Sequence, residues 1–105
     1  MATMTVIGTT AVPDHVRGAL SRWMTETMPG LYVGTLSGRV RHELWEAVSA
    51  TVGSGAAVLL HPQANEQGYE IRTAGERRRR PIDLDGLVLV AMNPMEVDNE
   101  TAKGV

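Results

Sequence analysis

Apolar positions in the N-terminal part of the chain change from a strand-like spacing to a helical one. Residues 4–9 are short, rich in β-branched side chains and flanked by polar residues, which is typical of a strand. Beyond them, Val16, Leu20 and Met24 recur at the spacing of an amphipathic helix. The pattern therefore predicts a strand over residues 4–9 and a helix over residues 13–24.

A turn and a second helical stripe follow. The Pro-Gly pair at 29–30 is typical of a type II turn, because proline fixes the first corner and glycine accepts positive φ at the second. Residues 26–28 and 31–36 are therefore predicted to form a hairpin. Ser37 is a favourable N-cap, and the apolar spacing after it predicts a second helix that ends at the glycines of residues 53–55.

The second half of the chain contains three apolar stretches and a polar end. Residues 56–61 are predominantly apolar, as expected of a central strand covered on both faces, with His61 capping it. Residues 69–73 alternate with period 2, which predicts a half-exposed strand. Residues 86–92 predict a further strand. Residues 93–105 have little to bury, so we expect a flexible tail there.

In chain order these elements form the ferredoxin-like βαββαβ pattern, with further strands appended. The predicted fold class is α+β, in which two helices cover an antiparallel sheet that carries an additional C-terminal strand. Each helix is expected to contribute one tryptophan, Trp23 or Trp45, to the core. Residues 1–92 are predicted to form one domain, and residues 93–105 an acidic tail.

Composition narrows the possible classes of protein. A length of 105 residues fits one small domain, and the absence of cysteine excludes disulfide scaffolds, thiolate zinc sites and thiol nucleophiles. No apolar run approaches the ~20 residues that cross a bilayer. The opening MATMTVIGTT has neither a cationic leader nor a long apolar segment. We therefore expect a cytoplasmic protein without a membrane partner.

The charged residues point to an anionic partner even though the formal net charge is −2. Four adjacent arginines at 77–80 repel one another and gain most when an anion neutralises them, although a solvated turn is the alternative. Arg17 near the start of the first helix, and Arg39 and Arg41 at the start of the second, lie where helix N-termini favour phosphate. These two helix ends are expected to lie near each other.

Residues suited to catalysis are few. The three histidines occur singly, without the spacing of a metal site, and the glycine-rich nucleotide signatures are absent. A nuclease needs carboxylates that converge on one or two Mg²⁺ ions. Glu66, Asp83 and Asp85 are the candidates for such a metal site, although Asp83 and Asp85 are more simply part of a turn.

Three runs carry a resemblance to a known family: AVPDHVRGALSRWM, GLYVGTLSGRVRHELWE and GYEIRTAGERRRRPIDLDGLVLV. Over residues 4–92 the chain resembles the small subunit of the CRISPR spacer-acquisition complex in its subtype I-E form, from a family of CRISPR-associated endoribonuclease-like proteins. The resemblance implies a ferredoxin-like homodimer that bridges dimers of the CRISPR integrase subunit. Duplex prespacer DNA then lies across the homodimer and is positioned for integration into the CRISPR array.

The resemblance also implies roles for individual residues. Arg17 follows the VPxxx motif. Arg78 and Arg79 match the two arginines of the family's E-x-R-R-x-P motif. The DNA-binding candidates, including the rest of the arginine run, are Arg17, Arg39, Arg41, Arg77, Arg78, Arg79 and Arg80. The integrase-docking candidates in the last strand are Leu87, Val88, Leu89 and Val90.

One position departs from the family pattern. The wider family carries an acidic residue at the end of the first strand, where two subunits bring carboxylates together around a metal, but this chain has Thr10 there. A hydroxyl does not supply the charge that holds a hard cation. We therefore expect no required cofactor. Mg²⁺ is expected as a cofactor only under the alternative hypothesis, in which the chain is an endonuclease that acts on RNA or DNA through Glu66 or Asp85.

Three hypotheses remain at this point. The first is a non-catalytic scaffold that positions duplex DNA in CRISPR adaptation, the second is a Mg²⁺-dependent nuclease, and the third is a ferredoxin-like regulatory module that binds a small anion. The missing strand-end acid favours the scaffold over the nuclease. The spread of arginines over three segments favours duplex DNA over a small ligand.

Overall fold

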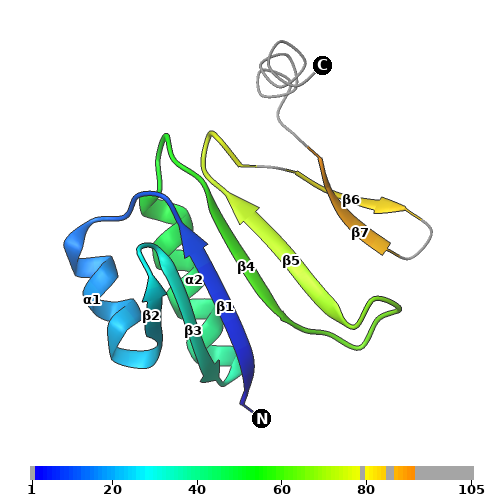
Figure 1. The fold of residues 1–105 in the computed structure, drawn as a ribbon, viewed down its shortest axis with the longest axis horizontal. Helices are drawn as coiled ribbons and strands as arrows, with labels where there is room; N and C mark the ends of the chain where they lie inside the picture. The colour runs from blue at the N-terminus through cyan, green and yellow to red at the C-terminus, as the bar shows by residue number, and fades with distance from the viewer. Residues whose placement is uncertain (1, 79, 85–86, 92–105) are drawn as a thin grey trace.

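The computed structural model describes residues 2–78, 80–84 and 87–91 of the chain (Figure 1). Its elements follow in the order β1 (Thr3–Thr9), α1 (Asp14–Trp23), β2 (Thr25–Met28), β3 (Leu31–Leu36), α2 (Gly38–Thr51), β4 (Ala57–Pro62), β5 (Tyr69–Ala74), β6 (Arg80–Leu84) and β7 (Leu87–Ala91). Of the helices described, neither α1 nor α2 is long and apolar enough to cross a membrane.

The main sheet is antiparallel throughout and has the strand order β2-β3-β1-β4-β5. Both helices pack on one face of this sheet (Figure 1). The elements from β1 to β4 form the ferredoxin-like βαββαβ unit, and β5 extends the sheet beyond β4. The predicted α+β class is confirmed. The C-terminal addition is larger than predicted, because β6 and β7 pair with each other in a separate two-stranded sheet.

Local signals in the sequence explain the bounds of the second helix and of the hairpin before it. The Ser37 side chain accepts a hydrogen bond from the Val40 amide at 3.3 Å, so α2 begins where the N-cap was predicted. Gly30 has φ of 82°, as the predicted turn requires. A Cβ at Gly30 would collide with the carbonyl oxygen of Thr9, and the Thr9 amide donates to the Gly30 carbonyl at 2.7 Å. The β2–β3 turn is therefore fixed against the end of β1.

The core lies between the helices and the sheet, and the two tryptophans differ in their place in it. Trp45 is only 7% exposed, as predicted. The prediction for Trp23 is wrong, because its side chain is 52% exposed. Trp23 is the last residue of α1, and the chain is already extended at Met24. Met24 is buried instead, where it packs against the backbone of Gly34.

Strand β4 departs from its predicted environment. Ala57, Leu59 and His61 are buried, whereas Val58 and Leu60 between them are only half-buried. This alternation arises because both described helices lie on the same face, so the single chain covers β4 on one face and not on both faces as expected. His61 lies inside the strand with its side chain buried on the helix-covered face, and it does not cap the strand as expected.

Candidate nucleic-acid interface

Several chain segments meet at the end of β1, the upper end of the sheet in Figure 1. The Thr9 amide donates to Gly30 in the β2–β3 turn, and the Thr10 amide donates to the Ala56 carbonyl at 2.9 Å. The loop after β5 joins the same end, because the Arg77 amide donates to the Gly55 carbonyl at 3.0 Å. These backbone contacts bring residues far apart in sequence onto one edge of the fold.

Arg17, on α1, lies beside a cavity of about 490 Å³ at this end. The cavity is lined by Thr9, Thr10, Ala11, Val12, Arg17, Glu26, Pro29, Gly30 and Tyr32. Its polar side chains come from β1 and the loop after it, α1, β2 and β3. The hydroxyl oxygen of Thr9 is buried without a hydrogen-bond partner in the described residues. The prediction that Arg17 lies near the start of α1 is confirmed.

The Arg17 side chain belongs to a network of three residues. Its Nη2 atom lies 3.5 Å from Oε2 of Glu26, and that same carboxylate oxygen accepts a hydrogen bond from the Gly30 amide at 3.0 Å. A hydrogen bond with Tyr32 raises the pKa of Arg17, with a smaller contribution from the charge of Glu26. The Gly30 amide is the main cause that lowers the pKa of Glu26. Both groups are therefore held in their charged forms.

Arg77 and Arg78, in the loop after β5, lie at the same end of the sheet as Arg17. The Arg78 guanidinium donates to the Gly75 carbonyl at 3.0 Å, which holds this side chain against the loop. Both arginines line a second, mostly apolar cavity of about 570 Å³. Thr9, Thr10, Pro29 and Gly30 line both cavities, so a single ridge separates Arg17 from the Arg77–Arg78 pair.

Arg39 and Arg41 do not join this group. Arg41 donates to Thr3 Oγ1 at 3.4 Å, at the opposite end of β1, and Arg39 pairs with Glu43 at 3.3 Å on the exposed side of α2. The seven residues of β1 span ~20 Å. The expectation that the two helix starts lie near each other is therefore wrong. Helix α2 follows β3, which runs antiparallel to β1, so it starts at the far end of the sheet.

Other predicted site residues lie outside the described residues or in the hairpin of β6 and β7. Arg79 and Asp85 lie outside the described residues, as does the predicted tail from residue 93 onward. Arg80 is the first residue of β6. The docking candidates Leu87, Val88, Leu89 and Val90 all belong to β7, which pairs with β6 in the separate hairpin sheet.

Thr10 has a structural role at the position where an acid would stand. Its Oγ1 accepts a hydrogen bond from the Ala56 amide at 2.9 Å, which continues the β1–β4 pairing by one residue beyond Thr9. A Cβ at Gly55 would collide with this Oγ1 atom, so the close approach depends on that glycine. The hydroxyl of Thr10 therefore extends the hydrogen bonding between β1 and β4 by one residue pair.

Glu66, a candidate metal ligand that lies within the described residues, is placed far from Thr10. Glu66 is exposed in the loop between β4 and β5, and β4 runs away from Thr10 toward that loop. Within the described ranges, no group of three or more His, Cys, Asp or Glu side chains lies close enough to hold a metal ion. In the described part of the chain, then, Glu66 stands apart from the end of β1.

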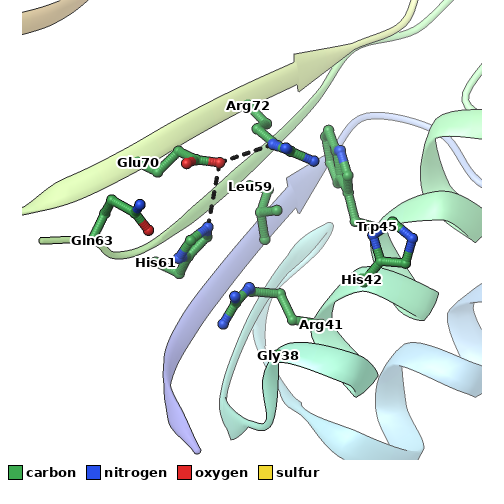
Figure 2. Close-up of a pocket in the computed structure, with 9 residues that line it drawn as sticks. All are labelled: Gly38, Arg41, His42, Trp45, Leu59, His61, Gln63, Glu70 and Arg72. Carbon is green, nitrogen blue, oxygen red and sulfur yellow. Dashed lines mark hydrogen bonds and ion pairs between the residues drawn. The ribbon is translucent and has the colours of Figure 1, made fainter.

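A third cavity, of about 300 Å³, lies between α2 and the strands β4 and β5 (Figure 2). Glu70 accepts from Arg72 at 2.9 Å and lies 3.6 Å from Nε2 of the buried His61. Arg41 points toward this cavity from α2 (Figure 2). Sequence reasoning missed Glu70 and Arg72, although their period-2 spacing places both on the helix side of β5.

The face of the sheet opposite the helices is uncharged on four strands, and we call it the open face. Ile7 and Leu59 point to the helices, so alternation and strand register assign their neighbours to the other side. The open face consists of Met4, Val6, Gly8, Leu31, Val33, Thr35, Val58, Leu60, Pro62, Tyr69, Ile71 and Thr73. Val33, Val6, Leu60 and Ile71 form one cross-strand row at its centre.

The comparison with protein families covers the elements that build this site. A family model described as CRISPR-associated protein (Cas_Cas2CT1978) matches residues 4–89, from β1 into β7. The match includes Arg17, Thr10 and the arginine run. Because it spans most of the chain, it assigns the protein to CRISPR defence: the chain is a Cas2-like member of the CRISPR-associated protein family Cas_Cas2CT1978.

Proposed function

We propose that this Cas2-like protein is a DNA-positioning scaffold of CRISPR adaptation. In this proposal a homodimer bridges dimers of the integrase subunit and holds duplex prespacer DNA for integration into the CRISPR array. The observation that carries the proposal is the grouping of Arg17, Arg77 and Arg78 around one ridge at the end of β1.

The arrangement of these arginines supports contacts with phosphates. They come from α1 and from the loop after β5, and they flank a ridge formed by Thr9, Thr10 and the β2–β3 turn. Contacts to the DNA backbone fix the position of a duplex without reading its sequence. Arg39 and Arg41 are proposed to contact the same duplex farther along, because they lie ~20 Å away at the other end of β1.

The open face supports the homodimer. Val33, Val6, Leu60 and Ile71 form a contiguous apolar row on an uncharged sheet face, and contiguous apolar patches of this kind often mark interaction sites. A two-fold axis brings the same face of two copies together, because one patch is then complementary to itself. The dimer then presents two arginine groups to one duplex.

The hairpin of β6 and β7 supports a separate docking element for the integrase. Within the described residues β7 pairs with β6 alone, so its other edge offers main-chain donors and acceptors to a partner strand. Leu87, Val88, Leu89 and Val90 form an apolar run in the sequence, which favours pairing with a strand of another protein.

The scaffold proposal predicts no nuclease activity. The purified wild-type chain is expected to leave duplex DNA, single-stranded DNA and RNA intact in Mg²⁺, because Thr10 offers a hydroxyl that is already bonded to Ala56. Glu66→Gln and Asp85→Asn are expected to leave integration near the wild-type rate, with folding checked by circular dichroism. Gel assays of labelled substrates measure the cleavage.

Thr10→Asp is the complementary variant, because it restores an acid at the end of β1 in each half of the dimer. Cleavage that appears only in this variant agrees with the scaffold proposal. Robust Mg²⁺-dependent cleavage by the wild-type chain, abolished by Glu66→Gln or Asp85→Asn, contradicts it and favours the nuclease.

A further inference from the structure

The third cavity, of about 300 Å³ between α2 and the strands β4 and β5, collects cationic and imidazole side chains from three elements. Arg41 comes from α2, His61 from β4 and Arg72 from β5 (Figure 2). None of these three residues lines either of the cavities beside the ridge at the end of β1. The third cavity is therefore a separate place in the described fold where cationic groups gather.

Arg72 is held in place on the wall that β5 forms. Its Nε atom donates to Oε1 of Glu70 at 2.9 Å, and the same oxygen lies 3.6 Å from Nε2 of His61. Among the residues that line this cavity, Glu70 is the only hydrogen-bond or ion-pair partner of Arg72 (Figure 2). Because that bond uses Nε, the two terminal nitrogens of the guanidinium remain available to a ligand in the cavity.

The wall that α2 forms is positive as well. Nη1 of Arg41 donates to Oγ1 of Thr3 at 3.4 Å, which holds this half-buried side chain at the edge of the cavity. Gly38, the first residue of α2, also lines the cavity. The first amides of a helix carry partial positive charge, and the first turn of α2 contains no acidic residue to offset it.

We propose that the third cavity binds the phosphate group of a small phosphorylated molecule. Arg41 and Arg72 carry two positive charges against the single negative charge of Glu70, and the planar fork of a guanidinium matches phosphate oxygens. The volume lies at the lower end for small-molecule sites, and His61 in its wall is only 7% exposed, so a small ligand fits better than a duplex. The site goes beyond the proposed function, because Arg72 has no part in the proposed DNA contacts.

The two tryptophans make a test specific to this cavity. Trp45 lines it, whereas Trp23 lies exposed at the end of α1 and does not. Inorganic phosphate is titrated into the ¹⁵N-labelled full chain at constant ionic strength, and the two indole N–H signals, assigned with Trp23→Phe, are followed by NMR. The Trp45 signal should shift and saturate at millimolar phosphate. The Trp23 signal should stay in place, and sodium chloride at the same ionic strength should move neither.

Three variants identify the groups that hold the phosphate. Arg72→Gln should weaken phosphate binding about 10-fold, as expected for the loss of a hydrogen bond from a charged donor. Glu70→Gln should strengthen it several-fold, because the competing negative charge is gone while the amide oxygen still accepts from Arg72. Arg22→Ala is the matched control: it removes an exposed arginine of α1 outside this cavity and should leave phosphate binding unchanged.

The outcomes that overturn the site are distinct from those that test the DNA scaffold. A Trp45 signal that does not move, or that moves equally in the wild type and in Arg72→Gln, overturns the phosphate site. Equal weakening by Arg72→Gln and Glu70→Gln does the same, because it shows that the pair only maintains the shape of β5. The dispersion of the same spectra confirms that each variant is folded.

Fluorescence anisotropy with a labelled duplex separates a small ligand from DNA as the source of the phosphate. Arg72→Gln should bind the duplex with wild-type affinity. Loss of duplex binding in parallel with loss of phosphate binding would make the cavity part of the DNA path and overturn the small-molecule assignment.

Discussion

Replacing Arg17, Arg77 and Arg78 together with alanine is expected to weaken duplex DNA binding by roughly a hundred-fold or more at moderate salt. The proposed homodimer would lose six guanidinium groups in this variant. Because each phosphate contact contributes about 0.9 to the slope of log affinity against log salt concentration, that slope should fall in magnitude by about five. Salt titrations of binding to unrelated duplexes measure the change, and the loss should be similar for every sequence.

Arg22→Ala is the control for this experiment, since it removes an exposed arginine from α1 outside the cavity that Arg17 lines. Its salt slope should stay close to that of the wild type. An unchanged slope in the triple variant, accompanied by lost integration, would contradict the phosphate contacts. It would indicate that these arginines bind a protein partner instead.

Leu60→Asp is expected to convert the proposed homodimer into a monomer. Leu60 lies between Val6 and Ile71 in the central row of the open face, so the two-fold axis brings two new carboxylates into an apolar interface. Burial of unpaired carboxylates costs several kcal/mol, which corresponds to a dissociation constant roughly a thousand-fold higher. The fold should survive, because Leu60 is only half-buried in the single chain.

Multi-angle light scattering at micromolar concentration measures the mass of this variant. Ala50→Asp is the matched control, since it places the same charge on the exposed side of α2, and it should remain dimeric. A Leu60→Asp protein that is still a dimer would show that the open face is not the interface.

Much of the fold follows from local sequence patterns. The Ser37 cap, the Pro-Gly turn at 29–30 and the two helical stripes predict their elements nearly to the residue, because each depends on neighbours in the chain. The burial of a side chain depends less on neighbouring residues in the sequence than the type of element does. Trp23 fits the apolar stripe of α1, but the helix ends there, and Met24 takes the buried place.

The candidate site was predictable only in part. The arginines were found by their clustering, but which of them share one end of the sheet depends on the direction of each element. Tracking the antiparallel strands would have separated Arg41 from Arg17, since α2 follows β3 and starts at the far end. Tyr32 and Glu26 were missed because neither stands out in sequence. The hairpin register that makes them partners was the available signal.

A prespacer-integration assay with the purified integrase subunit tests the scaffold role most directly. Duplex prespacer should enter the CRISPR array only when this chain is present and copurifies with the integrase. Integration should persist with Glu66→Gln and be lost when Arg17, Arg77 and Arg78 are replaced by alanine. Integration at the full rate without this chain, or with the folded triple variant in its place, would contradict a DNA-positioning scaffold.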